Sequence, residues 1–484
     1  MKQYIKNITA FVTCLLISSS VWGEVGTTGT WTATEISTTR SLYLESDISV
    51  KGIITIKSGG KLTINSNNGS RTIKAIADIY QIFMIEDGGT LEIIGTETAP
   101  IIIDGGATFG GTDGCPFIVN GSEYTQATAS GYQLDDAIRN SNGTLTLTYV
   151  TIKNVNGKGS GGALMINGSN NGESRPSTLT HCKIYNCQSE QGSAIQITNT
   201  NGDNGDAEKC KLTVQDSEIY HCYSWGDLKG GSGGTIRTNG GCVSHLYFIN
   251  TTVRDNYTAG AGCGIYWNGK GTDATTCYFD NCTFENNVAL GQGGGMMLET
   301  NFEFRNGTTT IKGNKVLKED GTGGGIVVTS YGGNAMAVTN DFTYTFTYDL
   351  SDKVTIEENY AGQGAGISFN LAGFSLNKDW QTHDEPSRKI IINLNLVGAI
   401  IKDNHAKKGN GGGIRFFNNT ANATSNKIGN RSLTINVKLN KGTITGNTAT
   451  QNGAGIYLFN ANIDNDAEPS DLLTVNSNEA ENNG

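Results

Sequence analysis

The chain has 484 residues, with 35 Lys and Arg against 45 Asp and Glu, so its formal net charge is −10. This acidic balance argues against binding to the phosphate backbone of a nucleic acid. The chain contains 66 Gly but only 5 Pro, and its aromatic and β-branched residues are too frequent for a disordered chain, which indicates many short strands joined by turns.

Residues 1–23 have the pattern of a secretory signal peptide. Lys2 and Lys6 supply the positive start, residues 8–17 are apolar, and small residues precede a cleavage point before Glu24. We therefore expect an exported protein, either secreted or on the outer cell surface. No other apolar run reaches the length that a membrane-spanning helix needs.

Residues 24–141 have an irregular strand pattern. Apolar and polar residues alternate in SLYLESDISV from Ser41 and in IYQIFMIEDGGTLEIIG from Ile79, as they do in half-buried strands. We expect an N-terminal cap followed by short coils of one repetitive fold, with ordered coils beginning near residue 41.

Residues 142–484 contain nine copies of one unit. Each copy has an apolar residue, two variable residues, Asn and a short turn, and then Gly, two residues and a second apolar residue. The copies are 29 to 47 residues apart, so insertions of variable length separate them. Val155, Cys187 and Cys222 replace the Asn in the first three copies.

The units predict short strands that must stack, because one unit alone cannot bury its apolar face. Asn suits one corner, since it tolerates left-handed backbone and its amide can bond to stacked neighbours. Gly suits the next corner, where no Cβ fits. We therefore predict an all-β protein, a single right-handed parallel β-helix with lateral loop insertions.

The paired motifs [I/F/V]-x-x-N and G-G-x-I resemble the repeat of polymorphic outer-membrane proteins, which belong to the pectin-lyase-like β-helix superfamily. The resemblance covers the chain from about Asn142 to its end and departs from the motif in the first three copies. It implies an exported, surface-displayed and adhesive protein.

The final segment, LLTVNSNEAENNG from Leu472, aligns with LTVQDSEIYHC from Leu212. This alignment places the last Asn corner at Asn483, so we expect the chain to end within a coil. Either a partner caps that end or the chain is a shortened form of a longer protein. An uncovered strand edge would favour end-to-end self-association or fraying after about Leu472.

Aromatic residues near loops are our candidates for ligand contact, since aromatic side chains often serve binding. The stretch DFTYTFTYDL places its aromatic residues on one strand face, which suits either sugar stacking or core packing. Insertions at 329–353, 370–399 and 418–441 follow the same strand on successive coils and should lie side by side. We expect this lateral lobe to be the ligand-contacting surface. The candidates are Trp225, Trp267, Trp380, Tyr344 and Tyr348.

We predict no catalytic residue, no metal site and no cofactor. Asp135 and Asp136 form the one tempting acidic pair, without a companion carboxylate motif. In the polar loop at 199–209, Asp203, Asp206 and Glu208 could bind calcium loosely, but their spacing matches no calcium loop. His181 and His221 each precede a Cys but have no second ligand at zinc spacing.

Nine cysteines remain after removal of the signal peptide. Cys187 and Cys222 occupy the same corner on successive coils, about 4.8 Å apart, so they either form a disulfide or stack as thiols. An odd number leaves at least one thiol unpaired in a monomer.

Two classes of function compete. The export signal, the repeat and the absence of a carboxylate cluster favour a non-catalytic adhesion, binding or structural display module for a polysaccharide or a cell-surface ligand. The alternative is a polysaccharide lyase or a glycoside hydrolase, which rests on fold analogy alone.

Overall fold

The computed structural model describes residues 25–168, 175–198, 209–226, 233–238, 243–267, 276–299, 301–329, 342–350, 352–370, 388–417, 431–438, 441–459, 462–463 and 474–481. The signal peptide predicted at residues 1–23 lies outside these ranges and stays a prediction.

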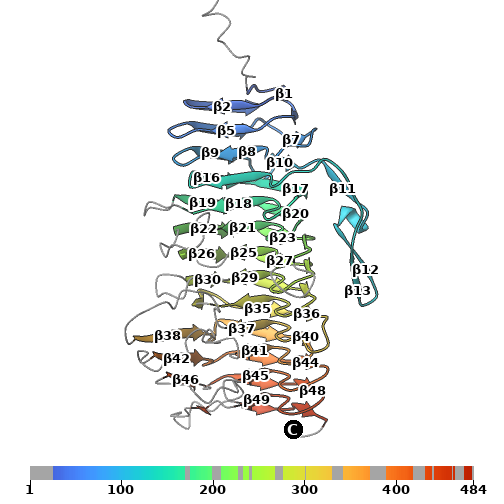
Figure 1. Cartoon of the computed structure of the whole chain (residues 1–484), viewed down its shortest axis with the longest axis vertical. Helices are drawn as coiled ribbons and strands as arrows, with labels where there is room; N and C mark the ends of the chain where they lie inside the picture. The colour runs from blue at the N-terminus through green and yellow to red at the C-terminus, as the bar shows by residue number, and fades with distance from the viewer. Residues whose placement is uncertain are drawn as a thin grey trace, which may run out of the picture.

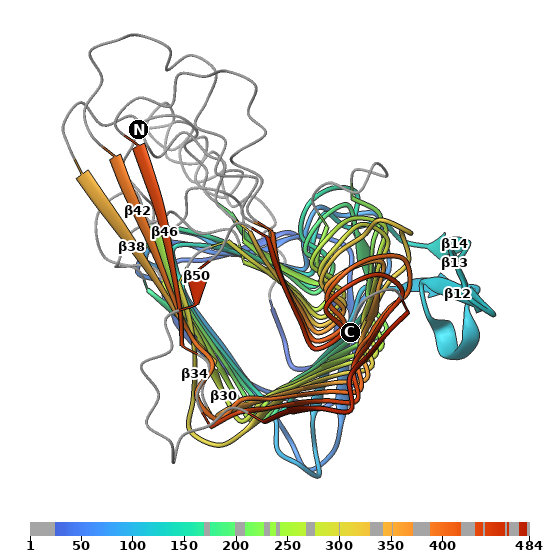
Figure 2. The ribbon, with the colours of Figure 1, turned by 90° about the horizontal axis from the view of Figure 1, so that it is seen from below.

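The chain forms a long stack of coils, a parallel β-helix built from three sheets (Figures 1 and 2). Sheet A contains β1 (Gly29–Trp31), β4 (Ile48–Val50), β7 (Arg71–Ala75), β10 (Ile101–Asp104), β17 (Val150–Asn156), β20 (Lys183–Ser189), β23 (Glu218–Tyr220), β24 (Tyr223–Ser224), β27 (Thr252–Arg254), β28 (Tyr257–Thr258), β31 (Thr283–Glu285), β32 (Val288–Ala289), β35 (Thr309–Lys312), β36 (Lys315–Val316), β39 (Val354–Glu357), β40 (Tyr360–Ala361), β43 (Ile400–Lys402), β44 (His405–Ala406), β47 (Thr443–Thr445), β48 (Thr448–Ala449), β51 (Thr474–Asn476) and β52 (Glu479–Ala480).

Sheet B contains β2 (Thr34–Ile36), β5 (Ile54–Ile56), β8 (Phe83–Ile85), β15 (Ile138–Ser141), β18 (Leu164–Asn167), β21 (Ile195–Thr198), β25 (Ile236–Thr238), β29 (Ile265–Trp267), β33 (Met296–Leu298), β37 (Ile326–Thr329), β41 (Ile367–Asn370), β45 (Ile414–Phe417) and β49 (Ile456–Phe459). Sheet C contains β3 (Thr39–Leu44), β6 (Lys61–Ser66), β9 (Thr90–Ile94), β16 (Thr144–Thr148), β19 (Pro176–Thr180), β22 (Lys209–Gln215), β26 (Val243–Ile249), β30 (Thr276–Asp280), β34 (Phe302–Arg305), β38 (Phe342–Asp349), β42 (Arg388–Asn395), β46 (Arg431–Lys438) and β50 (Asn462–Ile463).

The all-β parallel stack confirms the predicted fold class. Apolar residues pair with apolar residues in register, as Ile103 does with Ile152 of the next coil, and their inward side chains form one core along the axis. Burial of these stacked side chains is the main stabilising contribution, at roughly 25 cal/mol per Å² of apolar surface. Ordered coils begin at Gly29, earlier than the expected residue 41, because β1 already pairs with β4 and Trp31 is fully buried.

The recurring Asn residues form a buried hydrogen-bonded ladder. At Asn359, Oδ1 accepts from the backbone N–H and the Nδ2 of Asn314 at 2.9 and 3.0 Å, and Nδ2 donates to Oδ1 of Asn404 at 2.9 Å. Its Nδ2 also donates to the carbonyl of Ile311 at 2.9 Å. The bonding expected of the amides is therefore confirmed for the ladder residues Asn256, Asn287, Asn314, Asn359, Asn404, Asn447 and Asn478.

The left-handed backbone lies one residue earlier than we expected. The residue before each ladder Asn has a φ near +50° to +65°, as in Asp255, Asn286 and Gly313, and the ladder Asn itself does not. The turn is made at this preceding position, which leaves the ladder amide pointing along the stack toward its neighbours.

The Gly and Asn columns are sterically coupled. A Cβ on Gly325 would lie 2.7 Å from the carbonyl oxygen of Gly366 and 3.1 Å from Nδ2 of Asn359. Asn359 belongs to the coil that follows Gly325, so each such Gly faces the ladder position of the next coil. Ala163 and Ala194 occupy this corner where the next coil has Cys187 and Cys222 at the ladder position, whereas Thr235 occupies it although Asn256 follows. The space at this corner therefore depends on the ladder residue of the next coil, and Thr235 is an exception to the pairing of Gly with Asn.

The last Asn corner is Asn478, which corrects the alignment that placed it at Asn483. Val475 pairs with Ile444, and Oδ1 of Asn478 accepts from Nδ2 of Asn447 at 2.9 Å. The correct unit is V-N-S-N, an apolar residue followed three positions later by Asn, as in the other copies.

The long insertions place three strands side by side. β38, β42 and β46 pair in register over their full lengths and extend beyond the outline of the coils (Figure 2). Their side chains, with the exception of Asp349 and Asn395, and most of the connecting insertions lie outside the described part of the structure.

Candidate functional site: a groove beneath an arm

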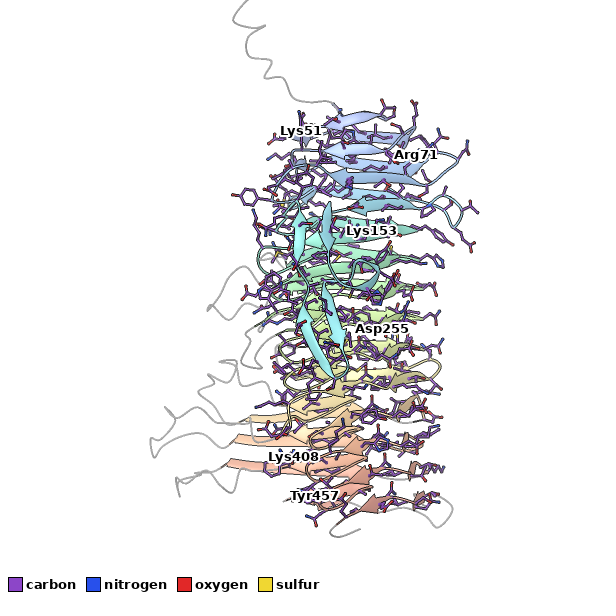
Figure 3. The ribbon with its side chains drawn as sticks, turned by 90° about the vertical axis from the view of Figure 1, so that its right-hand side faces the viewer. Lys51, Arg71, Lys153, Asp255, Lys408 and Tyr457 are labelled. Atoms are coloured by element: carbon purple, nitrogen blue, oxygen red, sulfur yellow. The ribbon has the colours of Figure 1, made fainter. Side chains whose placement is uncertain are left out.

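An arm leaves the helix after β10 and returns before β15. It consists of β11 (Ala107–Phe109), the short 3-10 helix η1 (Thr112–Gly114), β12 (Phe117–Asn120), β13 (Glu123–Gln126) and β14 (Ala129–Gly131), with β11 antiparallel to β14 and β12 antiparallel to β13. The arm runs along the outside of the coils, over the flank near Asp255 (Figures 1 and 3). The sequence pattern of residues 24–141 predicted only coils there.

The arm faces a column of sheet A residues that we call the flank column. Each member directly follows the ladder position of its coil, and successive members pair in register: Gln188, Tyr223, Tyr257, Val288, Lys315, Tyr360, His405, Thr448 and Glu479. From Tyr223 to Val288 the column is aromatic and apolar beneath the arm, and from Lys315 onward it is mostly polar. This change fixes where the arm can pack.

An aromatic cluster holds the arm in place. The ring of Tyr257 lies 5.7 Å from Phe117 and 5.1 Å from Tyr124, and it stacks on Tyr223 at 5.3 Å between centroids. Each such aromatic pair contributes about 0.5–1.5 kcal/mol beyond its buried area. A two-stranded hairpin is marginal on its own, so these contacts determine its position.

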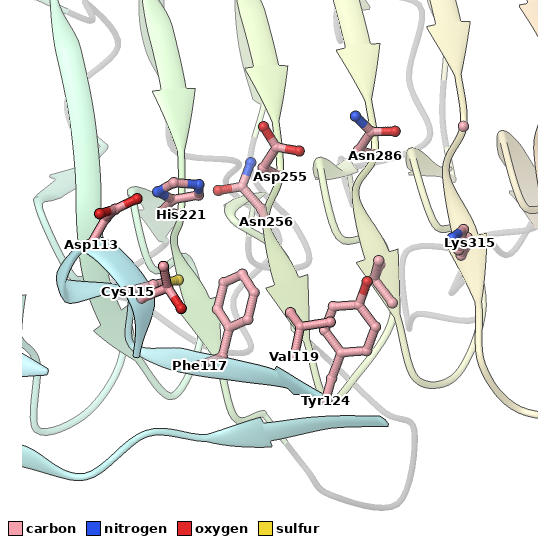
Figure 4. Close-up of a pocket in the computed structure, with 13 residues that line it drawn as sticks. Asp113, Cys115, Phe117, Val119, Tyr124, His221, Asp255, Asn256, Asn286 and Lys315 are labelled. Atoms are coloured by element: carbon pink, nitrogen blue, oxygen red, sulfur yellow. The ribbon is translucent and has the colours of Figure 1, made fainter. Parts of the chain in front are cut away.

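A cavity of about 380 Å³ lies between the arm and the coils (Figure 4). Phe117, Val119 and Tyr124 form its arm wall. Its floor is a row of corner residues from successive coils, His221, Asp255, Asn286 and Gly313, with Asp113 at one end and Lys315 at the other. The groove is therefore acidic at one end and basic at the other.

Electrostatics at the acidic end are set by burial and by ion pairing. Burial lowers the pKa of His221, although Asp255 and Asp113 act in the opposite direction. Asp255 forms an ion pair with Arg254 at 2.6 Å, and Arg254 also binds Glu218 at 2.6 Å. Besides His221, this end offers the carboxylate of Asp255, which Arg254 compensates, and the carboxylate of Asp113.

Cys115 lies close to His221 and Asp255 in this groove (Figure 4), the residue types of a thiol nucleophile with its base. Burial raises the pKa of its thiol to about 12, whereas a reactive cysteine needs a lowered pKa. Among the described residues no hydrogen bond links Cys115 to His221. The arrangement therefore suits packing rather than nucleophilic catalysis.

The groove continues past the arm's tip into a second cavity of about 590 Å³. Tyr124 and Lys315 line both cavities, so the two form one groove. The second cavity contains Lys315, Lys318, Lys407 and Lys408, with Gly121 and Ser122 of the arm's tip on the opposite wall. Lys315 and Lys407 lie 5.6 and 5.5 Å from the ring centre of Tyr360.

The aromatic residues predicted for ligand contact have different positions. Trp225 is half-buried beside the arm's aromatic cluster, 6.5 Å from Tyr223. Trp267 is fully buried in the core, where its indole N–H donates to the carbonyl of Asn301. The expectation of ligand contact is wrong for Trp267, because it ends the buried strand β29 and does not lie in a loop. Trp380 and the side chains of Tyr344 and Tyr348 lie outside the described part.

Cys187 and Cys222 stack at the ladder position as buried thiols. Their neighbours pair in register, Tyr185 with Tyr220 and Gln188 with Tyr223. Burial, together with contact with Cys187, raises the pKa of Cys222. Of the two predicted possibilities, a disulfide or stacked thiols, the structure contains the stacked thiols.

We expect the buried cysteines to resist a maleimide reagent in the native protein. Burial raises the pKa of the thiols of Cys182, Cys263 and Cys282 to about 12, so few thiolates are present at neutral pH. Mass spectrometry should show no native labelling at these positions and complete labelling after unfolding without reductant. Two cysteines unlabelled after unfolding, at 187 and 222, would instead support a disulfide.

The acidic pair near the arm is structural. Asp136 is fully buried, and its Oδ2 accepts from Nε and Nη2 of Arg139, the former at 3.0 Å. Burial raises the pKa of Asp136 to about 7. The pair lies where the arm returns to β15, so it anchors the arm rather than facing a substrate.

The described part of the chain lacks the features of a metal site and of a membrane-spanning helix. It contains no group of three His, Cys, Asp or Glu residues arranged to hold a metal ion, and no helix long and apolar enough to cross a membrane. The polar loop considered for calcium, with Asp203, Asp206 and Glu208, lies outside the described residues.

Sequence reasoning missed the groove residues, although one signal was present. The residue after each ladder position is Tyr223, Tyr257 and Val288 in three successive coils, at an outward-facing position. Exposed aromatic residues at one register position indicate a partner packed on them. A prediction of the arm from the sequence would have required reading that column across copies.

Part of the chain is similar to a known surface protein. It is 32% identical over 133 residues to the probable outer membrane protein pmp15 of Chlamydia pneumoniae. The matched stretch is 25% of this chain and only 14% of the relative's length. No family model and no solved structure matches the chain. The similarity agrees with the repeat resemblance and is limited to that part.

Proposed function

We propose that the protein is a non-catalytic binding module of adhesin type, exposed on the cell surface, with the groove beneath the arm as its ligand-contacting face. The observation that carries the proposal is the arm itself. It leaves a regular solenoid to cover one flank, and it encloses cavities of about 380 and 590 Å³ there. Binding sites are commonly such excursions on a rigid scaffold.

Three further observations support this function. The relative with partial similarity is described as an outer membrane protein. The coils present the groove along a rigid axis, where a polymer can make repeated contacts. Of the two aspartates that line the first cavity, Asp113 and Asp255, Asp255 is paired with Arg254, and a hydrolase needs a free carboxylate pair facing its substrate.

The test has two parts. Antibody against the purified protein should label intact cells that produce it, before any permeabilisation. The full chain should bind members of a panel of acidic and neutral polysaccharides without releasing unsaturated or reducing-end products, with or without calcium. Product formation that depends on calcium would contradict the proposal in favour of a lyase.

Replacement of Tyr257 by alanine should release the arm while the coils stay folded. The change removes the ring that contacts Phe117, Tyr124 and Tyr223, a loss of about 2–4 kcal/mol of packing. Limited chymotrypsin digestion should then cut within residues 107–131. The control is Tyr247→Ala, which removes a ring stacked on Tyr278 in sheet C, away from the arm. Equal resistance of both variants would argue against the aromatic anchor.

A further inference from the structure

We propose that the basic end of the groove binds the anionic groups of an acidic polysaccharide. This inference rests on the proposed binding function and names the class of its ligand. The starting observation is local charge. The second cavity is lined by Lys315, Lys318, Lys407 and Lys408 with Glu319 as its one acidic residue, although the whole chain has a net charge of −10.

Two of these lysines are available to a ligand. Lys408 pairs with Glu319, and Lys318 pairs with Asp320 at 3.2 Å. Lys315 and Lys407 are exposed, and within the described residues neither forms an ion pair with a carboxylate. Their ammonium groups instead lie near the ring of Tyr360. Because the Tyr360 ring carries no charge, the positive charge of both lysines remains uncompensated.

The shape of the groove favours a polymer. Lys315, Tyr360 and His405 follow one another in the flank column, at about 4.8 Å per coil. The arm's tip closes one side with Ser122 and Tyr124, whose hydroxyl groups suit the hydroxyls of a sugar. A chain lying along the axis would therefore meet the two lysines two coils apart, with the coil of Tyr360 between them.

Exposed ion pairs are individually weak, at about 0.2–1 kcal/mol each. A single anionic sugar would bind poorly, whereas a chain with repeated anionic groups gains from simultaneous contacts. The Lys side chain carries a flexible point charge and lacks the planar fork of Arg, so it can bind carboxylate and sulfate groups alike. We therefore infer that the ligand is a polysaccharide with repeated anionic groups and not a molecule with a single anionic group.

A nucleic acid fits these residues less well. Binding of a single strand depends on bases that stack on free aromatic faces. The ring of Tyr360 stacks on His405 at 4.9 Å and has lysine ammonium groups near it. The acidic surface outside the groove also repels a dense phosphate backbone.

The experiment titrates the full chain with dextran sulfate, polygalacturonate and neutral dextran by calorimetry, at low salt and at about 150 mM salt. We expect the two acidic polymers to bind, more weakly at the higher salt, and dextran not to bind. Dextran sulfate and polygalacturonate separate sulfate from carboxylate as the recognised group. The variant K315Q/K407Q should bind the acidic polymers about tenfold more weakly.

The matched control is K51Q/K74Q, which removes two exposed lysines far from the groove and changes the net charge equally. It should stay within about twofold of the parent chain. Equal weakening in both variants would overturn the proposal, because binding would then follow net charge. Tighter binding of single-stranded DNA through Lys315 and Lys407 would also overturn it.

The two proposals fail in different ways. Labelling of intact cells together with binding of neutral dextran alone would keep the proposed function and reject the acidic ligand. Binding of acidic polymers with cleavage products would reject the non-catalytic function and keep the ligand class.

Discussion

Replacement of Asn359 by leucine is expected to lower the free energy of unfolding by about 3–5 kcal/mol. The change removes four hydrogen bonds of a fully buried amide. It leaves the backbone N–H of Asn314 and the carbonyl of Ile311 without the partners that the ladder supplies. Each buried polar group without a partner costs about 1–3 kcal/mol, and apolar packing by leucine does not satisfy it.

Thermal and denaturant unfolding monitored by circular dichroism would measure this loss. The control is Asn67→Leu, an exposed position that should change stability by no more than about 0.5 kcal/mol. Amide exchange should also accelerate at residue 314, which loses its acceptor. A variant as stable as the control would show that the ladder contributes no net stability.

Alanine at Gly325 is expected to destabilise the protein by about 2–3 kcal/mol. The added Cβ would lie 2.7 Å from the carbonyl oxygen of Gly366 and 3.1 Å from both Asn359 Nδ2 and Ile356 Cγ2. Two of these three contacts belong to groups fixed by hydrogen bonds between coils, so the coils must separate slightly, and such overpacking costs about 1–3 kcal/mol.

The control for this change is Gly69→Ala, where an added Cβ would meet only the tip of Arg71, at 3.4 Å. That variant should be neutral or slightly stabilising, because alanine restricts the unfolded chain. The native chain already has Ala194 at the equivalent corner of a coil without the ladder Asn. Equal stability of Gly325→Ala and Gly69→Ala would contradict the steric coupling of the two columns.

The fold was predictable because each coil repeats the same constraints. The apolar residue of each unit indicates burial, its Asn indicates ladder bonding, and its Gly indicates a corner without room for a Cβ. All three constraints are local to one coil and its neighbour. The same locality explains the error at Asn483. A single unit at the end, without a following Gly motif, admits two alignments, and only the pairing of Val475 with Ile444 separates them.

The groove was not predictable, because it depends on contacts between distant segments. Phe117 and Tyr124 belong to an excursion without repeat pattern, and they pack on Tyr257, more than a hundred residues later. The prediction of ligand contact for Trp267 was wrong for a related reason. Its position near a loop indicated exposure, but register with Leu298 in β33 places it inside the coil stack.

The arm limits how the number of repeats can change during evolution. A whole coil can be duplicated or lost in a solenoid with little strain, since every interface between coils is alike. Between β17 and β28, however, an added coil would move Tyr257 about 4.8 Å along the axis and away from Phe117. The arm therefore fixes the number of coils that can lie beneath it. Beyond Lys315, where the flank column is polar, the count is free to vary.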